Sequence, residues 1–387
     1  MLQYLNNCET KLTWIGDAPG KTKKNALLIP QYNESGNGNF EARLNYFKKI
    51  ADENRGLLDV IIIDDGSTDE SVSKLNDFLN HNPGAFHIAS VFPNANKVGA
   101  LYLTTLAISH EFVILSDFDT DIIGVNKLVN SPILEKDTSL MGCYFRMLPF
   151  EGSGKVFQYQ QLEYSLARSL YKFHEKEKSI RVMPGAGSYY KREILISIYE
   201  QHSGLRSGED REATLIGLKL GYKTVYEDNI LALTRPPLSL KALIKQRVRW
   251  NLGYLETFNK EKKYYFEQIK QFSRLGIMTL MDIGLALLIV SFPFLVLLVS
   301  LTNVFYVMIL FLLLYVVNVS WCYNLIFLSP LESTEFKRKR TQSILIYPLF
   351  KILVDYFSWM GAIIVFIKKN KAVNNSTIQF IKKQEAA

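Results

Sequence analysis

The sequence predicts an α/β domain with a mostly parallel sheet, followed by C-terminal transmembrane helices. Two observations carry this prediction. In the first part of the chain, short β-rich runs alternate with helical patterns, which is the rhythm of βαβ units. Further along, no Asp, Glu, Lys or Arg occurs between Ile283 and Leu331. A run of that length holds two helices of roughly 20 residues, the length that crosses the hydrocarbon of a bilayer.

The α/β prediction depends on four β-rich runs, each followed by apolar residues at helical spacing. The runs are Ala26–Gln31, Leu57–Ile63, Ala85–Phe92 and Phe112–Leu115. Successive strands joined through helices pair in parallel. In such sheets ligands bind beyond the carboxyl ends of the strands, so we expect the chemistry in the residues that follow each run.

The uncharged run predicts a helical hairpin in the membrane. Its first span would cover residues 276–298 and its second span residues 304–328. A third apolar stretch, residues 344–367, contains Lys351 and Asp355, which lie four apart on one helical face and can neutralise each other. Whether this stretch spans the bilayer or lies flat on it stays open, so two or three transmembrane helices are expected.

Basic residues flank the predicted hairpin. Lysines cluster in residues 260–263 before it, and residues 337–340 after it are all Lys or Arg. The positive-inside rule therefore places both flanks in the cytoplasm, in a multi-pass protein of the cell (inner) membrane. The N-terminus lacks the apolar core of a signal peptide, so the α/β domain is expected to be cytoplasmic. The net charge of +8 comes largely with basic residues beside the predicted spans, where they can contact anionic lipid headgroups, so no nucleic-acid partner is expected.

These features divide the chain into five expected segments. They are an N-terminal leader (1–24), an α/β domain (25–235), interfacial helices (236–275), a membrane region (276–367) and a basic tail (368–387). The cysteines Cys8, Cys143 and Cys322 lack the paired spacing of zinc or redox sites, so we expect reduced, structural thiols.

Asp117 and Asp119 follow the fourth run and are candidate metal ligands. With one residue between them in an extended backbone, both carboxylates point the same way and can face one Mg²⁺ or Mn²⁺ ion. Such an ion would neutralise charge on a departing diphosphate. The structural alternative is that Asp119 caps the next helix, although Asp121 is the better placed cap.

Asp64 and Asp65 end the second run and offer acceptors for a base and a ribose. Gly66 would let the backbone pass close to a ligand. The competing interpretation is a capping box, formed by Ser67 and Glu70 at a helix start. A capping box accounts for Ser67 and Glu70, but it does not require two adjacent aspartates at the end of a strand.

Two further charged residues stand at predicted helix starts. Lys97 opens the helix after the third run, where phosphate contact and simple solvation are equally good interpretations. Asp210, within Gly208–Glu212, is a candidate general base. Acidic residues in a first turn also suit the helix dipole, and on that segment alone the structural interpretation is favoured.

A later helix presents Gln246, Arg249 and Trp250 on one face, because they are spaced i, i+3 and i+4. The opposite side carries an apolar stripe between Leu240 and Leu255. Arginine suits diphosphate oxygens and tryptophan suits the apolar face of a sugar ring, so a functional role is favoured over rim packing. The small residues at 185–188 indicate either an acceptor groove or a plain turn into a strand.

Five motifs, taken in order, resemble the processive inverting enzymes of glycosyltransferase family 2, which include cellulose, chitin and hyaluronan synthases. The motifs are Ile29–Glu34, Asp64–Asp69, Asp117–Thr120, Gly208–Arg211 and Gln246–Trp250. The last, Gln-x-x-Arg-Trp, is the most specific. The resemblance implies a GT-A fold, that of nucleotide-diphospho-sugar transferases, and a membrane-bound enzyme that uses a UDP-sugar.

The resemblance also implies roles for individual residues. The donor-binding set would be Pro30, Tyr32, Glu34, Asp64, Asp65, Lys97, Asp117, Gln246 and Arg249. The acceptor-binding set would be Gly187, Ser188, Glu209 and Trp250. Asp117 and Asp119 would bind the metal, and Asp210 would take the proton from the acceptor hydroxyl. Catalysis would also draw on Asp119 and Arg249, with the metal and Arg249 stabilising the leaving UDP.

The segment Gly208–Arg211 looks closer to chitooligosaccharide and hyaluronan synthases than to bacterial cellulose synthases, which favours UDP-N-acetylglucosamine over UDP-glucose. The acceptor would be a growing polysaccharide or oligosaccharide. Compared with the family, no transmembrane helix is expected before the catalytic domain and only two or three after it, so whether the chain exports its own product stays open. One alternative is a single transfer to a glycolipid-type acceptor, a ceramide or polyprenyl carrier. A more distant one is a non-catalytic nucleotide-sugar-binding membrane protein. A homo-oligomer stays open.

Overall fold

The computed structural model describes residues 10–328 and 332–385, so Cys8 lies outside the described residues. The chain divides into two compact units. The first comprises Met1–Phe150 with Tyr171–Arg235, and the second comprises Glu151–Leu170 with Pro236–Ala387. Residues 151–170 thus group with the C-terminal part of the chain, whereas the sequence had placed them within the α/β segment.

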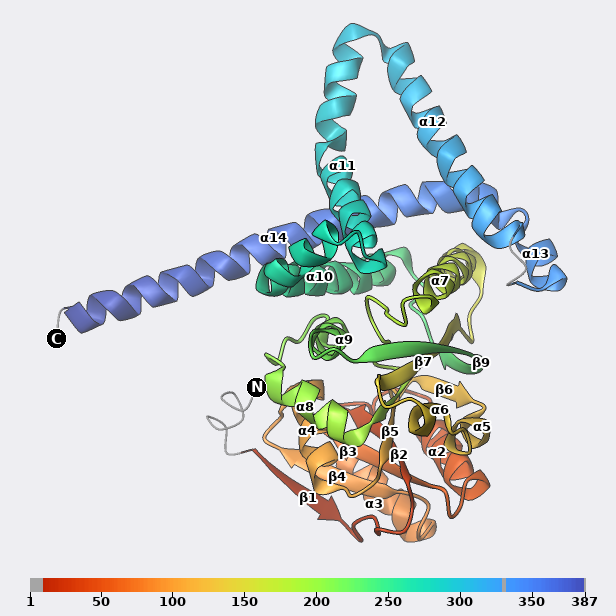
Figure 1. Ribbon diagram of the computed structural model, residues 1–387, viewed down its shortest axis with the longest axis vertical. Coiled ribbons are helices and arrows are strands. Elements are labelled where there is room, and N and C mark those ends of the chain that lie inside the picture. The colour runs from red at the N-terminus through yellow and green to blue at the C-terminus, as the bar shows by residue number, and fades with distance from the viewer. Residues whose placement is uncertain (1–9, 329–331, 386–387) are drawn as a thin grey trace. The chain divides into compact units, whose positions relative to one another are not determined.

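Within the described residues, the strands of the first unit form one nine-stranded sheet (Figure 1). The strands are β1 (Lys11–Ile15), β2 (Asn25–Gln31), β3 (Leu58–Asp64), β4 (His87–Phe92), β5 (Phe112–Leu115), β6 (Thr120–Ile123), β7 (Leu140–Pro149), β8 (Ser188–Lys191) and β9 (Lys223–Thr234). Their order is β1-β4-β3-β2-β5-β8-β7-β9-β6.

Four adjacent strands of this sheet have the predicted parallel pairing. Strands β4, β3, β2 and β5, which are the four predicted runs, pair in parallel. Beyond β5 the pairing becomes mixed, because β8 runs antiparallel to β5 and β7, and β6 runs antiparallel to β9. The sheet is therefore mixed rather than mostly parallel. Lys11–Ile15, within the segment taken as a leader, forms the edge strand β1 and pairs antiparallel with β4.

Helices cover the sheet and bury both of its faces. They are α2 (Phe40–Glu53), α3 (Ser71–His81), α4 (Asn96–Ala107), α5 (Val125–Val129), α6 (Ile133–Lys136), α8 (Arg192–Gln201) and α9 (Glu209–Lys219). Alternate residues of β2 enter different cores: Leu27 packs in the core that contains Phe47 of α2, and Leu28 in the core that contains Leu101 of α4. A strand buried on both faces explains its continuous apolar sequence.

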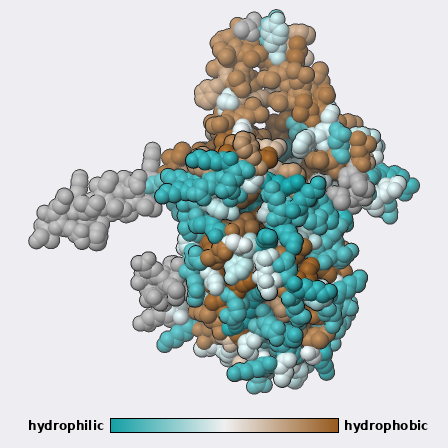
Figure 2. All heavy atoms as spheres, viewed as in Figure 1, coloured by the Kyte–Doolittle hydropathy of each residue, from teal (hydrophilic) through white to brown (hydrophobic). Residues whose placement is uncertain are grey.

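The second unit is helical. Its elements are α7 (Gly154–Glu175, which ends in the first unit), α10 (Leu240–Lys270), α11 (Arg274–Thr302), α12 (Val304–Cys322), the π-helix η1 (Tyr323–Phe327), α13 (Thr334–Arg340) and α14 (Ser343–Glu385). Among the described residues, three segments are long and apolar enough to span a membrane: Arg274–Leu301, Val304–Phe327 and Ser343–Asn370. Figure 2 shows the apolar surface that α11 and α12 present.

The two helices of the predicted hairpin are present as α11 and α12, with Asn303 between them, and their insertion into a membrane stays a prediction. The third apolar stretch is also long enough to span, and the predicted pairing within it is present, since Lys351 Nζ lies 2.5 Å from Asp355 Oδ2. Cys143 and Cys322 are buried and unpaired, as expected of structural thiols.

Two predicted helix caps are wrong. Asp121 does not cap a helix, because it lies in β6 and the next helix starts after Gly124. Helix α3 begins at Ser71, and the side chain of Glu70 makes no capping bond, so Ser67 and Glu70 form no capping box. The side chain that binds the start of α3 is instead Asp69, whose Oδ1 accepts from the backbone N of Ser71 at 3.0 Å.

The predicted apolar stripe of α10 is only partly buried, with Leu240 and Ile244 packed against the core of this unit. The buried residues of this helix include Leu243, Arg247 and Tyr254, whereas Ile244 and Val248 are only partly buried. The reason is that Arg247 is buried as an ion pair with Glu163, which hydrophobic periodicity does not detect.

Candidate active site

The residues that follow β3 are tied to neighbouring loops. Asp64 is buried and accepts from Gln31 Nε2 and from the backbone N of Ser67, the latter at 3.2 Å. Asp65 is also buried and accepts from Asn94 Nδ2 at 3.0 Å and from the backbone N of Ala95 at 2.7 Å. Burial raises the pKa of Asp65 to about 7, although the Ala95 hydrogen bond opposes this shift. Both carboxylates therefore make hydrogen bonds to residues at or after the ends of neighbouring strands. Their contact with a donor stays a prediction.

Gly66 adopts φ +69°, a conformation that favours glycine. A Cβ here would lie 2.9 Å from the backbone N of Asn94, so no side chain fits. The group that comes close to Gly66 is thus the backbone of the β4–α4 loop, whereas we had expected a ligand.

Asp117 and Asp119 lie in the turn between β5 and β6. The backbone N of Thr120 donates to Asp117 O at 3.1 Å, so the backbone here is a turn and not the extended strand that we expected. The two carboxylates still interact, since burial and then the charge of Asp117 raise the pKa of Asp119. Glu34, after β2, also senses both aspartates: burial raises its pKa first, and their charges raise it further.

The donor set of this turn fits a divalent metal ion completed by phosphate oxygens. No group of three His, Cys, Asp or Glu side chains suited to a metal ion occurs in the described residues. Two carboxylates, however, are what Mg²⁺ uses when substrate phosphates and water complete its coordination. Asp117 and Asp119 are therefore suited to hold such an ion together with a diphosphate, and not alone.

Lys97 connects this turn to the start of α9. Its Nζ lies 2.5 Å from Asp117 Oδ1 and 3.5 Å from Glu209 Oε1. Burial lowers the pKa of Lys97, but the two carboxylates outweigh burial and raise it, so the ammonium stays charged. With a side chain only 28% exposed, Lys97 is a paired cation within the site and not a solvated surface residue.

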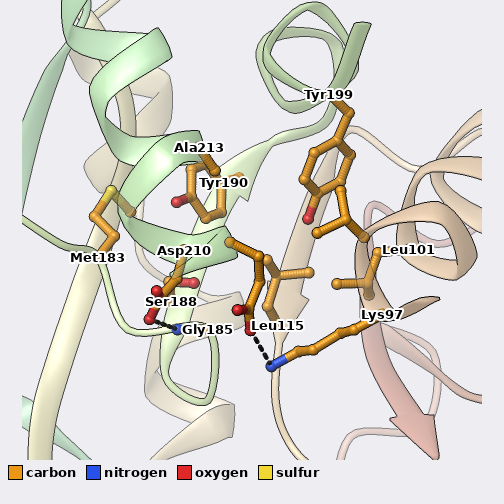
Figure 3. A pocket seen from close by; sticks show the side chains of 12 residues that line it. Lys97, Leu101, Leu115, Met183, Gly185, Ser188, Tyr190, Tyr199, Asp210 and Ala213 are labelled. Carbon is orange, nitrogen blue, oxygen red and sulfur yellow. Dashed lines mark hydrogen bonds and ion pairs between the residues drawn. The ribbon is translucent and has the colours of Figure 1, made fainter. Parts of the chain in front are cut away.

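Asp210 and Lys97 line the same pocket, with Gly185, Tyr190 and Tyr199 (Figure 3). Asp210 Oδ1 accepts from the backbone N of Arg211 at 2.8 Å, and Oδ2 lies 3.5 Å from the backbone N of Gly185. Burial raises the pKa of Asp210 to about 6, and the charge of Glu209 adds to this shift. A carboxylate that only satisfied the helix dipole would not need to lie in a pocket opposite a lysine.

The small residues before β8 have different environments. A Cβ on Gly185 would lie 3.1 Å from Lys97 Nζ, so this glycine gives Lys97 room. A Cβ on Gly187 would lie 2.8 Å from Ala232 Cβ and 3.1 Å from Met147 Sδ, so packing explains that glycine. Ser188 is buried and lines the pocket. The acceptor-binding roles of Gly187 and Ser188 stay predictions.

Gln246, Arg249 and Trp250 belong to α10 of the second unit. Trp250 is 44% exposed, and the guanidinium of Arg247 lies 3.9 Å from the centre of its ring. Arg247 also donates to Gln246 Oε1 and forms an ion pair with Glu163. The guanidinium of Arg247 therefore packs on the ring of Trp250, while the side chain of Arg249 is exposed.

Two protein-family models match this sequence: "Glycosyl transferase family 2" over residues 26–198 and "Glycosyl transferase family group 2" over residues 137–324. Together they match residues 26–324 to glycosyltransferase family 2. This match, together with the mixed sheet and its covering helices, confirms the predicted α/β fold of the GT-A type.

Curated relatives in this family have related names. An N-acetylglucosaminyltransferase of Rhizobium meliloti (strain 1021) is 27% identical over 238 residues, which are 58% of this chain and 54% of the relative. A hyaluronan synthase of Streptococcus pyogenes serotype M1 is 23% identical over 250 residues, or 60% of this chain and 57% of the relative. The chain thus spans about half the length of the curated relatives that it matches.

A solved structure is also similar. It is a mannosyltransferase from Pyrobaculum calidifontis in complex with GDP-Man and Mn²⁺, 17% identical to this chain. The alignment covers 92% of this chain and 94% of that one, with a TM-score of 0.48. A likeness at this level adds nothing to the family assignment.

Sequence reasoning missed Arg43, whose side chain reaches the turn that carries Asp119. Arg43 Nε donates to Phe118 O at 2.6 Å. A signal was present, because Arg43 stands in the apolar face of α2 between Phe40 and Phe47. A charged residue in a buried stripe needs partners, and here they are backbone carbonyls of the turn and the carboxylate of Asp121.

Proposed function

We propose that this chain is a membrane-bound inverting glycosyltransferase that transfers a sugar from a UDP-sugar to the hydroxyl of a growing oligosaccharide or polysaccharide. The observation that carries the proposal is the position of Lys97. Its ammonium lies 2.5 Å from Asp117 and 3.5 Å from Glu209, beside Asp210, so a phosphate-binding cation joins the suggested metal ligands to the suggested base.

In this proposal, the donor occupies the carboxyl end of the parallel strands. Tyr32, Glu34, Asp64 and Asp65, with Pro30 of β2, hold the uridine. A bound Mg²⁺ or Mn²⁺, with Asp117 and Asp119 as protein ligands, supplies neutralisation of the diphosphate charge. Lys97 adds a second positive charge at the same diphosphate.

Asp210 acts on the acceptor. As the acceptor oxygen forms its bond to the anomeric carbon, the bond from that carbon to UDP breaks, and the hydroxyl proton passes to the Asp210 carboxylate. Attack from the side opposite UDP inverts the anomeric centre. Gln246 and Arg249 act on the diphosphate, and Trp250 acts on the acceptor with Gly187, Ser188 and Glu209.

The relatives' names and the Gly208–Arg211 segment favour UDP-N-acetylglucosamine over UDP-glucose as the donor. The three apolar segments support a membrane protein. Its place in the cell (inner) membrane, with the first unit in the cytoplasm, is part of the proposal and follows from the basic flanks of the hairpin.

Donor binding by the full chain in detergent tests the metal site. In wild type, we expect Mn²⁺ to tighten UDP binding, and in Asp117→Asn with Asp119→Asn we expect that metal effect to vanish, because the ion loses both protein ligands. Asp52→Asn, at an exposed aspartate of α2 paired with Arg55, is the matched control. If the double variant bound UDP with the wild-type response to metal, the assignment would be refuted.

Activity is tested separately by UDP release from a panel of UDP-sugars, with product length as the second readout. Release with UDP-N-acetylglucosamine and a product of several sugars is expected. If the product were a lipid carrying one added sugar, the polymer proposal would be refuted and the glycolipid alternative supported. Binding with no release by either wild type or Asp210→Asn would support the alternative of a non-catalytic nucleotide-sugar-binding protein.

A further inference from the structure

The turn between β5 and β6 is bound by two arginines that are distant in sequence. Arg43 of α2 is only 5% exposed, and it donates from Nε to Phe118 O at 2.6 Å and from Nη2 to Thr120 O at 2.8 Å. Arg235, next to the end of β9, donates from Nη1 to Asp119 O at 3.0 Å. Three consecutive carbonyl groups of the turn therefore accept from guanidinium groups.

A carboxylate joins the two arginines. Asp121 Oδ1 accepts from Arg43 Nη1, and Arg235 Nη1 lies 3.2 Å from the same oxygen. Arg235 Nη2 lies 3.4 Å from Asp121 Oδ2. Charge-assisted bonds of this kind are the strong ones, and the rigid fork of arginine can bind two acceptors at once. Asp121 thus fixes both guanidinium groups in the orientation in which they bind the turn.

The contacts on both sides of Asp119 determine where its side chain points. When the peptide planes before and after a residue are fixed, the direction of its Cα–Cβ bond is fixed too. Asp117 and Asp119 repel each other as two like charges in a partly buried turn. A free turn would relax by moving the carboxylates apart. The bonds from Arg43 and Arg235 oppose that relaxation.

We propose that Arg43 and Arg235, joined by Asp121, are positioning residues that preset Asp117 and Asp119 for a divalent cation and a diphosphate. The inference rests on the proposed function of the site. The arginines act through the backbone of the turn. Their loss should therefore weaken donor binding only when the metal takes part.

The test uses Arg235→Gln and Asp121→Asn in the full chain in detergent. Arg235 is the better target because its side chain is 22% exposed, whereas loss of the buried Arg43 could unfold the domain. Arg192→Gln is the matched control: its side chain is 15% exposed, and it also donates to a backbone carbonyl, that of Thr105 at 2.9 Å. Arg235→Lys keeps the charge but not the fork.

Calorimetric titration with UDP, in Mn²⁺ and in EDTA, gives the readout. In Mn²⁺ we expect about 10-fold weaker UDP binding by Arg235→Gln and by Asp121→Asn, a loss of the size of one hydrogen bond. In EDTA, both should bind UDP as wild type does. Arg235→Lys should recover part of the metal-dependent affinity, and Arg192→Gln should match wild type throughout. Thermal unfolding of each variant shows whether it is folded.

Three outcomes separate the explanations. Wild-type affinity in Mn²⁺ for both Arg235→Gln and Asp121→Asn would overturn the positioning role. Equal losses in Mn²⁺ and in EDTA would also overturn it, because they would show general loosening of the domain. A wild type whose UDP binding ignores Mn²⁺ would instead overturn the proposed metal site, and this inference with it.

Discussion

Transfer should lose rate as the pH falls through about 6, because Asp210 must be ionised to accept the proton of the acceptor hydroxyl. The pKa of Asp210 is raised from 3.8 to about 6, mainly by burial and then by the charge of Glu209, while the charge of Lys97 opposes the shift. The pocket thus sets the base close to neutral pH, where it accepts protons better than an ordinary aspartate does.

The size of the effect follows from the fraction ionised. With a pKa of about 6, Asp210 is only about one tenth ionised at pH 5, so kcat should be about tenfold below its plateau. An aspartate with its ordinary pKa would be more than about nine tenths ionised at that pH and would show almost no loss. Glu209→Gln removes the second cause of the shift but not burial, so the acid limb should move to lower pH without disappearing.

The assay is UDP release at saturating donor and acceptor, from about pH 4.5 to about pH 8. Saturation removes the contribution of Asp65, whose pKa is raised to about 7 in the free site, because kcat does not report the donor-binding groups of the free enzyme. The limb expected near pH 6 uses the pKa that Asp210 has in the ligand-free pocket. Asp77→Asn, at an exposed aspartate of α3, is the control and should leave the limb in place. An acid limb near pH 4 in wild type, or an unchanged limb in Glu209→Gln, would refute the reasoning.

The same shift has a consequence for stability. Because the folded-state pKa of Asp210 lies above its unfolded value, the folded chain binds more protons between about pH 4 and 6, and stability falls as the pH rises through that window. Asp210→Asn should therefore be inactive, yet at pH 7 more stable than wild type by on the order of 2 kcal/mol. Thermal unfolding at about pH 4 and pH 7 measures this, because the advantage should vanish at the lower pH.

Two further predictions concern α10. Trp250→Ala should abolish transfer while UDP binding survives, because the exposed indole is proposed to contact the acceptor. Titration with UDP measures binding, and UDP release measures transfer. Equal loss of both would show that Trp250 is a packing residue. Arg247→Met should lower the free energy of unfolding by roughly 2 kcal/mol, because it removes the ion-pair partner of the partly exposed Glu163. Denaturation in detergent, with Lys245→Met at an exposed position of the same helix as control, would contradict this if both variants behaved alike.

The parallel half of the sheet could be predicted because its signals are local. Strands β2 to β5 are apolar runs with polar residues at or soon after their ends, and helices follow most of them. The antiparallel half has no such signal. Strand β8 is four residues long and pairs with β5 far earlier in the chain, and β1 is a partly exposed edge strand that begins with a lysine. Which distant strand pairs with such a segment depends on the whole sheet.

Buried charges explain the errors within helices. Hydrophobic periodicity counts arginine as exposed, so it misplaced the buried face of α10, where Arg247 packs against Glu163 from a segment 84 residues away. It likewise treated α2 as packing alone, although Arg43 reaches a carbonyl 75 residues further along the chain. In both helices, the partner that makes burial tolerable is remote in sequence and has no spacing that a pattern could detect.

The aspartate pair shows how a motif can be found for a wrong structural reason. We expected Asp117 and Asp119 to share a face because strand residues two apart do so, yet they lie in a turn. In a turn nothing in the local backbone forces two like charges to stay together. The bonds from Arg43 and Arg235 can supply that constraint, so the spacing of the motif identifies the candidate ligands while residues outside it determine their geometry. A chain that kept both aspartates but lost Asp121 would then keep the motif and lose much of its metal-dependent affinity for UDP.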